Sequence, residues 1–182
     1  LYDYGAREAL RNTDRFLGSG GLNTVAYISS AQIAQASRDV ELKESVEQLD
    51  MTLCTEPDLL EAAGIAARSR IRELDEKVYL RELLRKLYRN RNSVYLLADT
   101  QQELEMLEDL IQEYQGNLYI QGRGTCEMFD RQPERLVNEL NDVAPDAVLS
   151  RMPWPQDIVL MKEYGQYENA RLWVSLPYGA VS

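Results

Sequence analysis

The chain contains no histidine, and this absence limits the chemistry open to it. A Ser-His-Asp triad, a Cys-His pair and the usual zinc sites all need an imidazole. Acid–base chemistry would therefore depend on Asp, Glu, Tyr, Lys or Cys. Carboxylates alone can bind Mg²⁺ or Mn²⁺, but no compact Asp-x-Asp spacing indicates such a site. We therefore expect neither a metal nor a cofactor.

Two groups of side chains could still take part in binding. Arg68, Arg70 and Arg72 stand at alternate positions and could face a diphosphate, although a solvated surface paired with nearby acids is the commoner outcome. Cys126 is expected in a loop that borders a pocket, but no histidine is there to activate its thiol, so a structural role is favoured. We expect Cys126 and Cys54 both to be free thiols, because a disulfide scaffold of this size usually carries more cysteines.

The elements that must hold these residues alternate between strands and helices. Short apolar runs between polar or glycine residues predict six strands, at 24–28, 51–54, 94–98, 118–121, 147–150 and 171–175. Apolar residues at helical spacing predict helices at 6–17, 31–37, 40–48, 56–65, 76–89, 100–114, 133–141 and 158–167. Ser29-Ser30 and Thr100 are expected to cap helices, the latter in a capping box with Glu103.

This alternation is typical of an α/β fold with a mostly parallel sheet and helices on both faces. We expect one α/β domain over 1–182 with two Rossmann-like lobes, about 1–90 and 91–182. Ligands of such sheets bind beyond the carboxyl ends of the strands. The loops of interest are therefore 29–32, 55–58, 99–100, 122–129 and 151–157.

Composition narrows the range of partners. The chain has 182 residues, of which 45% are hydrophobic, and this is enough to bury a core. Its net charge of −10 argues against nucleic acid and against an anionic membrane as the main partner. No apolar run reaches 18 residues, so no transmembrane segment is expected. The beginning of the chain does not read as a signal peptide, and two cysteines suit a reducing cytoplasm.

The order and spacing of four segments are similar to those of the WecG/TagA/CpsF family of bacterial glycosyltransferases. The segments are AYISSAQIAQASRDVELKESVEQLDMTL, SRIRELD, SVYLLADTQQELEMLEDLIQEYQGNLYIQGRG and LVNELNDVAPDAVLSRMPWPQD. The resemblance covers roughly residues 4–178. It implies transfer of a sugar, often N-acetylmannosamine, from a UDP-sugar donor to a lipid-linked acceptor in the synthesis of cell-surface polysaccharide or teichoic acid. A longer form of the chain could then lie at the membrane periphery.

The resemblance also assigns catalytic roles, to positions whose residue types have changed. The family's proposed base is the Asp of a P-D-G turn, which Thr55 matches here, with Glu56 in place of the Gly. Arg70 matches the family's active-site Arg. Of its P-K-Q-E stretch only Gln156 is kept, with Asp157 in place of Glu. Because a threonine hydroxyl is not deprotonated near pH 7, loss of the base would cost on the order of 10²–10⁴ in rate.

Positions that the resemblance places beside the donor are altered as well. Ser30 stands in the family's Asn-Pro pair, and Ser150 opens the stretch that replaces a G-x-G turn. Gly122 and Gly124 are the glycines kept in a loop that contacts the donor. Glycines let the backbone donate N–H groups to phosphate, whereas the stretch MPWP is bulky and its prolines have no N–H. We therefore expect weak binding of UDP.

Three functions are open on this reading. The first, which we favour, is a diverged glycosyltransferase homologue that no longer transfers sugar efficiently and acts as a scaffold or as a partner of an active paralogue. The second is an active UDP-sugar transferase with Glu56 or Asp157 as base, and with Arg70 and Gln156 holding the donor.

The third is a non-catalytic interaction module with a closed pocket. Exposed Met152, Trp154 and Tyr178 would then form a patch for a partner or for a homo-oligomer. A simpler interpretation of Trp154 is that it packs over the edge of the sheet.

Overall fold

The computed structural model describes residues 6–53, 76–165 and 170–176. Its helices are α1 (Ala6–Leu17), α2 (Ser30–Ala36), α3 (Val40–Glu47), α6 (Glu76–Arg89), α7 (Gln101–Tyr114), α8 (Pro133–Val143) and α9 (Gln156–Tyr164). Its strands are β1 (Asn23–Tyr27), β2 (Met51–Leu53), β3 (Val94–Ala98), β4 (Ile120–Thr125), β5 (Ala147–Arg151) and β6 (Leu172–Ser175).

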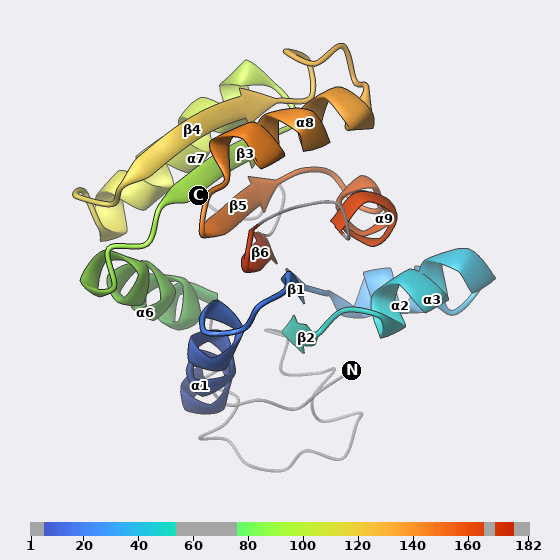
Figure 1. Cartoon of the computed structure of the whole chain (residues 1–182). Coiled ribbons are helices and arrows are strands. Elements are labelled where there is room, and N and C mark those ends of the chain that lie inside the picture. Colours follow the sequence, from blue (N-terminus) through green and yellow to red (C-terminus); the bar gives the residue numbers. More distant parts are fainter. Residues whose placement is uncertain (1–5, 54–75, 166–169, 177–182) are drawn as a thin grey trace.

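The strands form one six-stranded sheet in the order β2-β1-β6-β5-β3-β4 (Figure 1). All neighbouring strands run parallel. The predicted α/β class with a parallel sheet is thereby confirmed. Strand β6 is last in the chain but lies between β1 and β5, so strands from both halves of the sequence share this sheet.

Helices cover both faces of the sheet. One core cluster joins the sheet to α1, α6 and α7, and a second joins it to α2, α3, α8 and α9. Because successive side chains of a strand point to opposite faces, Leu149 of β5 belongs to the first cluster and Val148 to the second. This burial on both faces explains why β3 is apolar and buried at every position.

Both predicted caps accept a hydrogen bond from their helix, but the structure shows a full capping box at Ser29 and only one half of the predicted box at Thr100. Ser29 forms a full capping box with Gln32 at the start of α2. Thr100 accepts a hydrogen bond from the N–H of Glu103 at 3.2 Å, which begins α7. The carboxylate of Glu103 lies near Arg151 of β5, with 3.5 Å between Oε2 and Nε.

Several element boundaries differ from the prediction, and two of these differences bear on the site. Strand β4 continues to Thr125, so Gly122 and Gly124 lie within a strand and not in a loop. The tyrosine ring of Tyr95 on β3 covers both glycines: a Cβ on Gly122 would lie 2.7 Å from the ring, and one on Gly124 would lie 2.2 Å from its hydroxyl oxygen. Glycine within a strand often marks such a close approach. Helix α9 begins at Gln156 instead of Ile158.

Candidate functional site

The carboxyl edge of the sheet is the candidate site, because parallel sheets bind their ligands there. Strands β1 to β6 all end at this edge, and the first turns of α2, α7 and α9 follow there. Three predicted catalytic residues, Thr55, Glu56 and Arg70, lie outside the described residues. Gln156 and Asp157 are described and stand in the first turn of α9.

Asp157 is buried against the end of β6, with 6% of its surface exposed. The Ser175 hydroxyl donates to its Oδ2 atom at 2.5 Å. Its Oδ1 atom is buried, and we find no hydrogen-bond partner for it in the described structure. Burial raises the pKa of Asp157 from 3.8 to about 6, although the Ser175 hydroxyl and the nearby backbone N–H groups of Ile158 and Asp157 lower it. The carboxyl group can therefore change charge close to neutral pH.

Ser150 lies beside this pair. It is in register with Ser175 on the neighbouring strand, and both serines are buried. The indole Nε1 of Trp173 donates to the Ser150 hydroxyl oxygen at 2.8 Å. The structure thus brings Ser150 and Asp157, both predicted site residues, to the same side of the sheet. Each already forms a hydrogen bond within the chain, to Trp173 and to Ser175 respectively.

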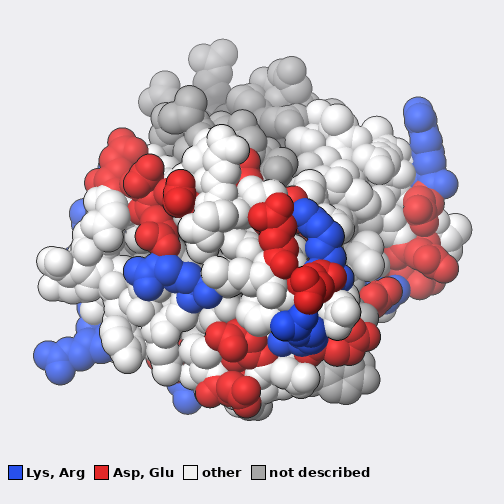
Figure 2. Space-filling model, turned by 90° about the horizontal axis from the view of Figure 1, so that it is seen from above, with Lys and Arg blue, Asp and Glu red and all other residues white. Residues whose placement is uncertain are grey.

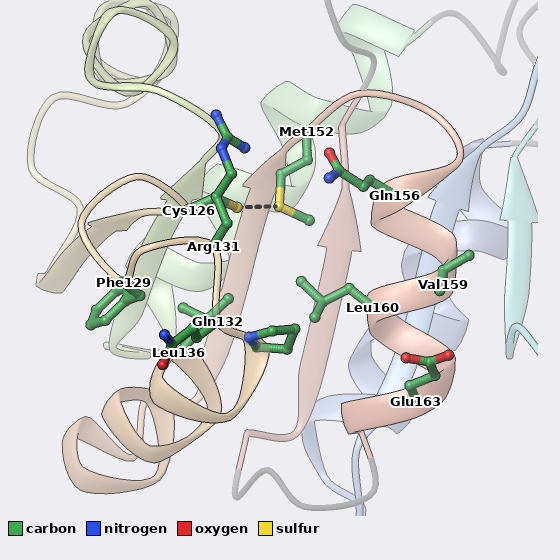
Figure 3. A pocket seen from close by; sticks show the side chains of 11 residues that line it. Cys126, Phe129, Arg131, Gln132, Leu136, Met152, Gln156, Val159, Leu160 and Glu163 are labelled. Atoms are coloured by element: carbon green, nitrogen blue, oxygen red, sulfur yellow. Dashed lines mark hydrogen bonds between the residues drawn. The ribbon is translucent and has the colours of Figure 1, made fainter.

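A small hollow opens between α8, α9 and the loop after β4 (Figure 3). Its volume is about 140 Å³, which is below the roughly 300–1,000 Å³ of most small-molecule sites. Buried or half-buried apolar residues form much of its wall: Phe129, Pro133, Leu136, Met152 and Leu160. Exposed polar residues also line it: Arg131, Gln132, Gln156 and Glu163. Gln156 is therefore the predicted catalytic residue that borders a cavity.

Cys126 points toward Met152 across the base of this hollow (Figure 3), with 3.6 Å between the two sulfurs. Burial raises the pKa of its thiol, and the nearby Asp99 carboxylate raises it further. The thiol is therefore protonated near neutral pH and a poor nucleophile. Cys126 is a free cysteine, as predicted, whereas Cys54 lies outside the described residues.

The remaining predicted contacts with a donor come from β4 and from the start of α2, which follows β1 at the same edge. Gly122 and Gly124 face the Tyr95 ring, and Ser30 is the exposed first residue of α2. Their role in binding a nucleotide stays a prediction. What the structure adds is a packing reason for both glycines that does not involve a ligand.

Arg151 is a feature of this edge that sequence reasoning missed. It is the last residue of β5, and only 1% of its surface is exposed. By strand alternation its side chain lies on the opposite face from Ser150, beside α7. Its position directly after a predicted apolar strand was the available signal, because helices cover both faces of such a sheet.

The predicted apolar patch does not form as expected. Met152 is only 2% exposed, which contradicts its place in a surface patch. Trp154 is half-buried against the α8–α9 side of the sheet, and its Nε1 donates to Gln35 of α2 at 2.9 Å. This supports the simpler interpretation of Trp154 as a packing residue. Tyr178 lies outside the described residues.

On the face drawn in Figure 2, acidic and basic side chains are interspersed, so this face gives no indication of a polyanion site. In the described ranges, no three Cys, Asp or Glu side chains come together as metal ligands. A search of the same ranges finds no helix long and apolar enough to cross a membrane.

Comparison with models of known protein families finds no match for this sequence. Comparison with curated proteins finds none either. The resemblance to the WecG/TagA/CpsF family therefore stays a prediction.

Proposed function

We propose that the chain is a diverged homologue of the WecG/TagA/CpsF glycosyltransferases that no longer transfers sugar and acts by binding. The observation that carries this proposal is the filled space at the end of β5. Arg151 and Met152 are 1% and 2% exposed there, where the resemblance places a G-x-G turn beside the donor. Two large side chains thus stand where the resemblance requires glycines, whose lack of a side chain lets a backbone approach a diphosphate.

The shortage of free backbone N–H groups at this edge supports the same proposal. A diphosphate is commonly held by free N–H groups of a turn and a helix N-terminus. Here Pro153 and Pro155 have no N–H to donate. The N–H of Asp157 bonds to the Pro153 carbonyl at 3.3 Å, and that of Leu176 bonds to the Ser150 carbonyl at 2.8 Å.

The nearby hollow is also a poor match for a UDP-sugar. It is small, and much of its wall is apolar. Arg131 is the cationic residue in its lining, and its guanidinium already pairs with Asp99 at 2.7 Å. A donor diphosphate would have to displace that carboxylate.

Calorimetry with UDP, and an assay of UDP release with UDP-N-acetylmannosamine and a lipid-linked acceptor, test the proposal. We expect no heat of UDP binding at millimolar ligand and no release above background. Turnover that Glu56→Gln abolishes, but exposed Glu105→Gln leaves intact, would overturn the proposal.

A binding role also predicts a protein partner. The partner would be an active paralogue or a second copy of this chain. It would be met in a reducing cytoplasmic compartment, as the low cysteine count suggests. Light scattering of the isolated chain separates these two partners, because only self-association raises its mass.

One observation favours the second candidate, an active UDP-sugar transferase with Asp157 as base and Gln156 beside the donor. The pKa of Asp157 is raised by burial to about 6, and a general base works best with a pKa near the operating pH. This candidate requires turnover that Asp157→Asn removes and that declines below about pH 6. Turnover retained by Asp157→Asn would rule it out.

A further inference from the structure

The Arg151 guanidinium is a buried cation that the described structure leaves incompletely paired. Neither Nε nor Nη2 has a hydrogen-bond partner in the described part of the chain. The nearest acid is Glu103, whose Oε2 atom lies 3.5 Å from Nε, which is long for an N–H···O bond. Oε2 is itself a buried oxygen without a hydrogen bond in the same ranges.

These two nitrogens lie on one edge of the guanidinium group. An arginine presents two parallel N–H groups along such an edge, and their spacing matches two oxygens of a carboxylate or a phosphate. Glu103 approaches this edge through one oxygen at a distance that satisfies neither donor. The group best suited to this edge is therefore an oxyanion that can reach both nitrogens at once.

The surroundings of Arg151 also favour a negative group. Ala98, which pairs with Arg151 across the sheet, is the last residue of β3, and α7 follows it directly with Thr100 as its cap. The positive end of this 14-residue helix thus lies beside the arginine. Asp99 does not compete, because its carboxylate pairs with Arg131 at 2.7 Å.

Burial makes the missing hydrogen bonds of Arg151 costly. A buried charge whose hydrogen bonds are not made is strongly unfavourable. Glu103 is the group that can move away, because its side chain is 18% exposed whereas that of Arg151 is 1% exposed. A ligand of suitable size could replace the Glu103 carboxylate and bond to both nitrogens.

We propose that Arg151, at the start of α7, binds a small oxyanion the size of phosphate or of a carboxylate group, and that Glu103 closes this site when no ligand is bound. The site lies on the α7 side of the sheet and needs no nucleotide. It is separate from the sugar-transfer chemistry that the proposed function concerns.

Calorimetric titration of the full chain with inorganic phosphate tests this site, with acetate as a second probe and sodium chloride at matched ionic strength as the blank. We expect millimolar binding of phosphate by the unaltered chain. Glu103→Gln removes the competing charge but keeps the size of the side chain, so it should tighten binding about tenfold. Exposed Glu105→Gln on the same helix is the matched control and should leave the affinity unchanged.

Two substitutions of the arginine complete the experiment. Arg151→Lys keeps the charge but loses the paired donors, and Arg151→Met removes both. Each should weaken binding at least tenfold, alone and together with Glu103→Gln. If the Met variant does not fold, the Lys variant and the comparison of Glu103→Gln with Glu105→Gln still test whether Arg151 binds the anion.

The proposal is overturned if the unaltered chain binds neither probe, if Glu103→Gln binds no tighter than Glu105→Gln, or if affinity survives both changes of Arg151. Binding of phosphate alone identifies a phosphate group as the ligand, and binding of acetate as well extends the site to carboxylates. A UDP titration separates the two proposals: UDP binding that depends on Arg151 would sink the proposed function but uphold this site.

Discussion

Replacing Asp157 by asparagine should change how the stability of the protein depends on pH. In the folded chain burial raises the pKa of this carboxyl group from 3.8 to about 6. Well below pH 3.8 the group is protonated in both the folded and the unfolded state, and it costs nothing. Well above pH 6 it is ionised in both, and the folded state bears the full cost of a buried charge.

The sign and size of the effect follow from this difference. Between the two pKa values the folded state binds more protons than the unfolded state, so the free energy of unfolding falls as the pH rises. A gap from 3.8 to about 6 corresponds to roughly 3 kcal/mol. About 1.4 kcal/mol of this develops between about pH 5 and about pH 7.5, where the rest of the chain is least disturbed by acid.

Urea unfolding of the unaltered chain and of Asp157→Asn across that range measures the effect. Hydrogen bonds that the new amide gains or loses give a constant offset, and only the change with pH is used. The Asp157→Asn variant should become more stable relative to the unaltered chain as the pH rises. Exposed Asp142→Asn controls for the loss of one negative charge. A stability difference for Asp157→Asn that stays flat across the range would refute the buried, titrating carboxyl group.

Two further packing contacts can be tested by substitution. Gly124→Ala would place a methyl group 2.2 Å from the Tyr95 hydroxyl oxygen, so urea unfolding should show a loss of about 1–3 kcal/mol, whereas Gly21→Ala, with open space around it, should show little. Tyr79→Phe removes a buried 2.7 Å hydrogen bond to Thr13 and should cost about 1 kcal/mol. Thr13→Val should cost more, because the buried Tyr79 hydroxyl then loses its partner; equal losses for these last two variants would contradict that bond.

The sequence was most informative where the pattern of apolar residues had only one structural solution. Strand β3 is a run of five apolar residues between polar ones, and burial on both faces of a parallel sheet is the usual reason for such a run. The cap at Thr100 was equally readable, because its hydroxyl group and the N–H of Glu103 satisfy each other locally. Order and type of the described elements therefore followed from local rules.

Contacts between distant residues were not readable in this way. The sequence around Gly122 and Gly124 would look the same whether the glycines lay in a ligand-binding loop or in a strand. The contact that explains them is the Tyr95 ring, which belongs to another strand. Likewise, nothing local shows that Ser175 would bond to Asp157, 18 residues earlier. Only the order of the strands brings β6 to the start of α9.

The two sides of the carboxyl edge differ in a way that bears on function. On the α9 side, hydrogen bonds within the chain engage Ser150, Ser175 and one oxygen of Asp157. On the α7 side, two donors of Arg151 have no such partner within the described ranges. Since a ligand gains most from groups that the protein itself does not satisfy, the α7 side is the better place for an anion. The two proposals thus concern opposite sides of this edge, and neither requires the other.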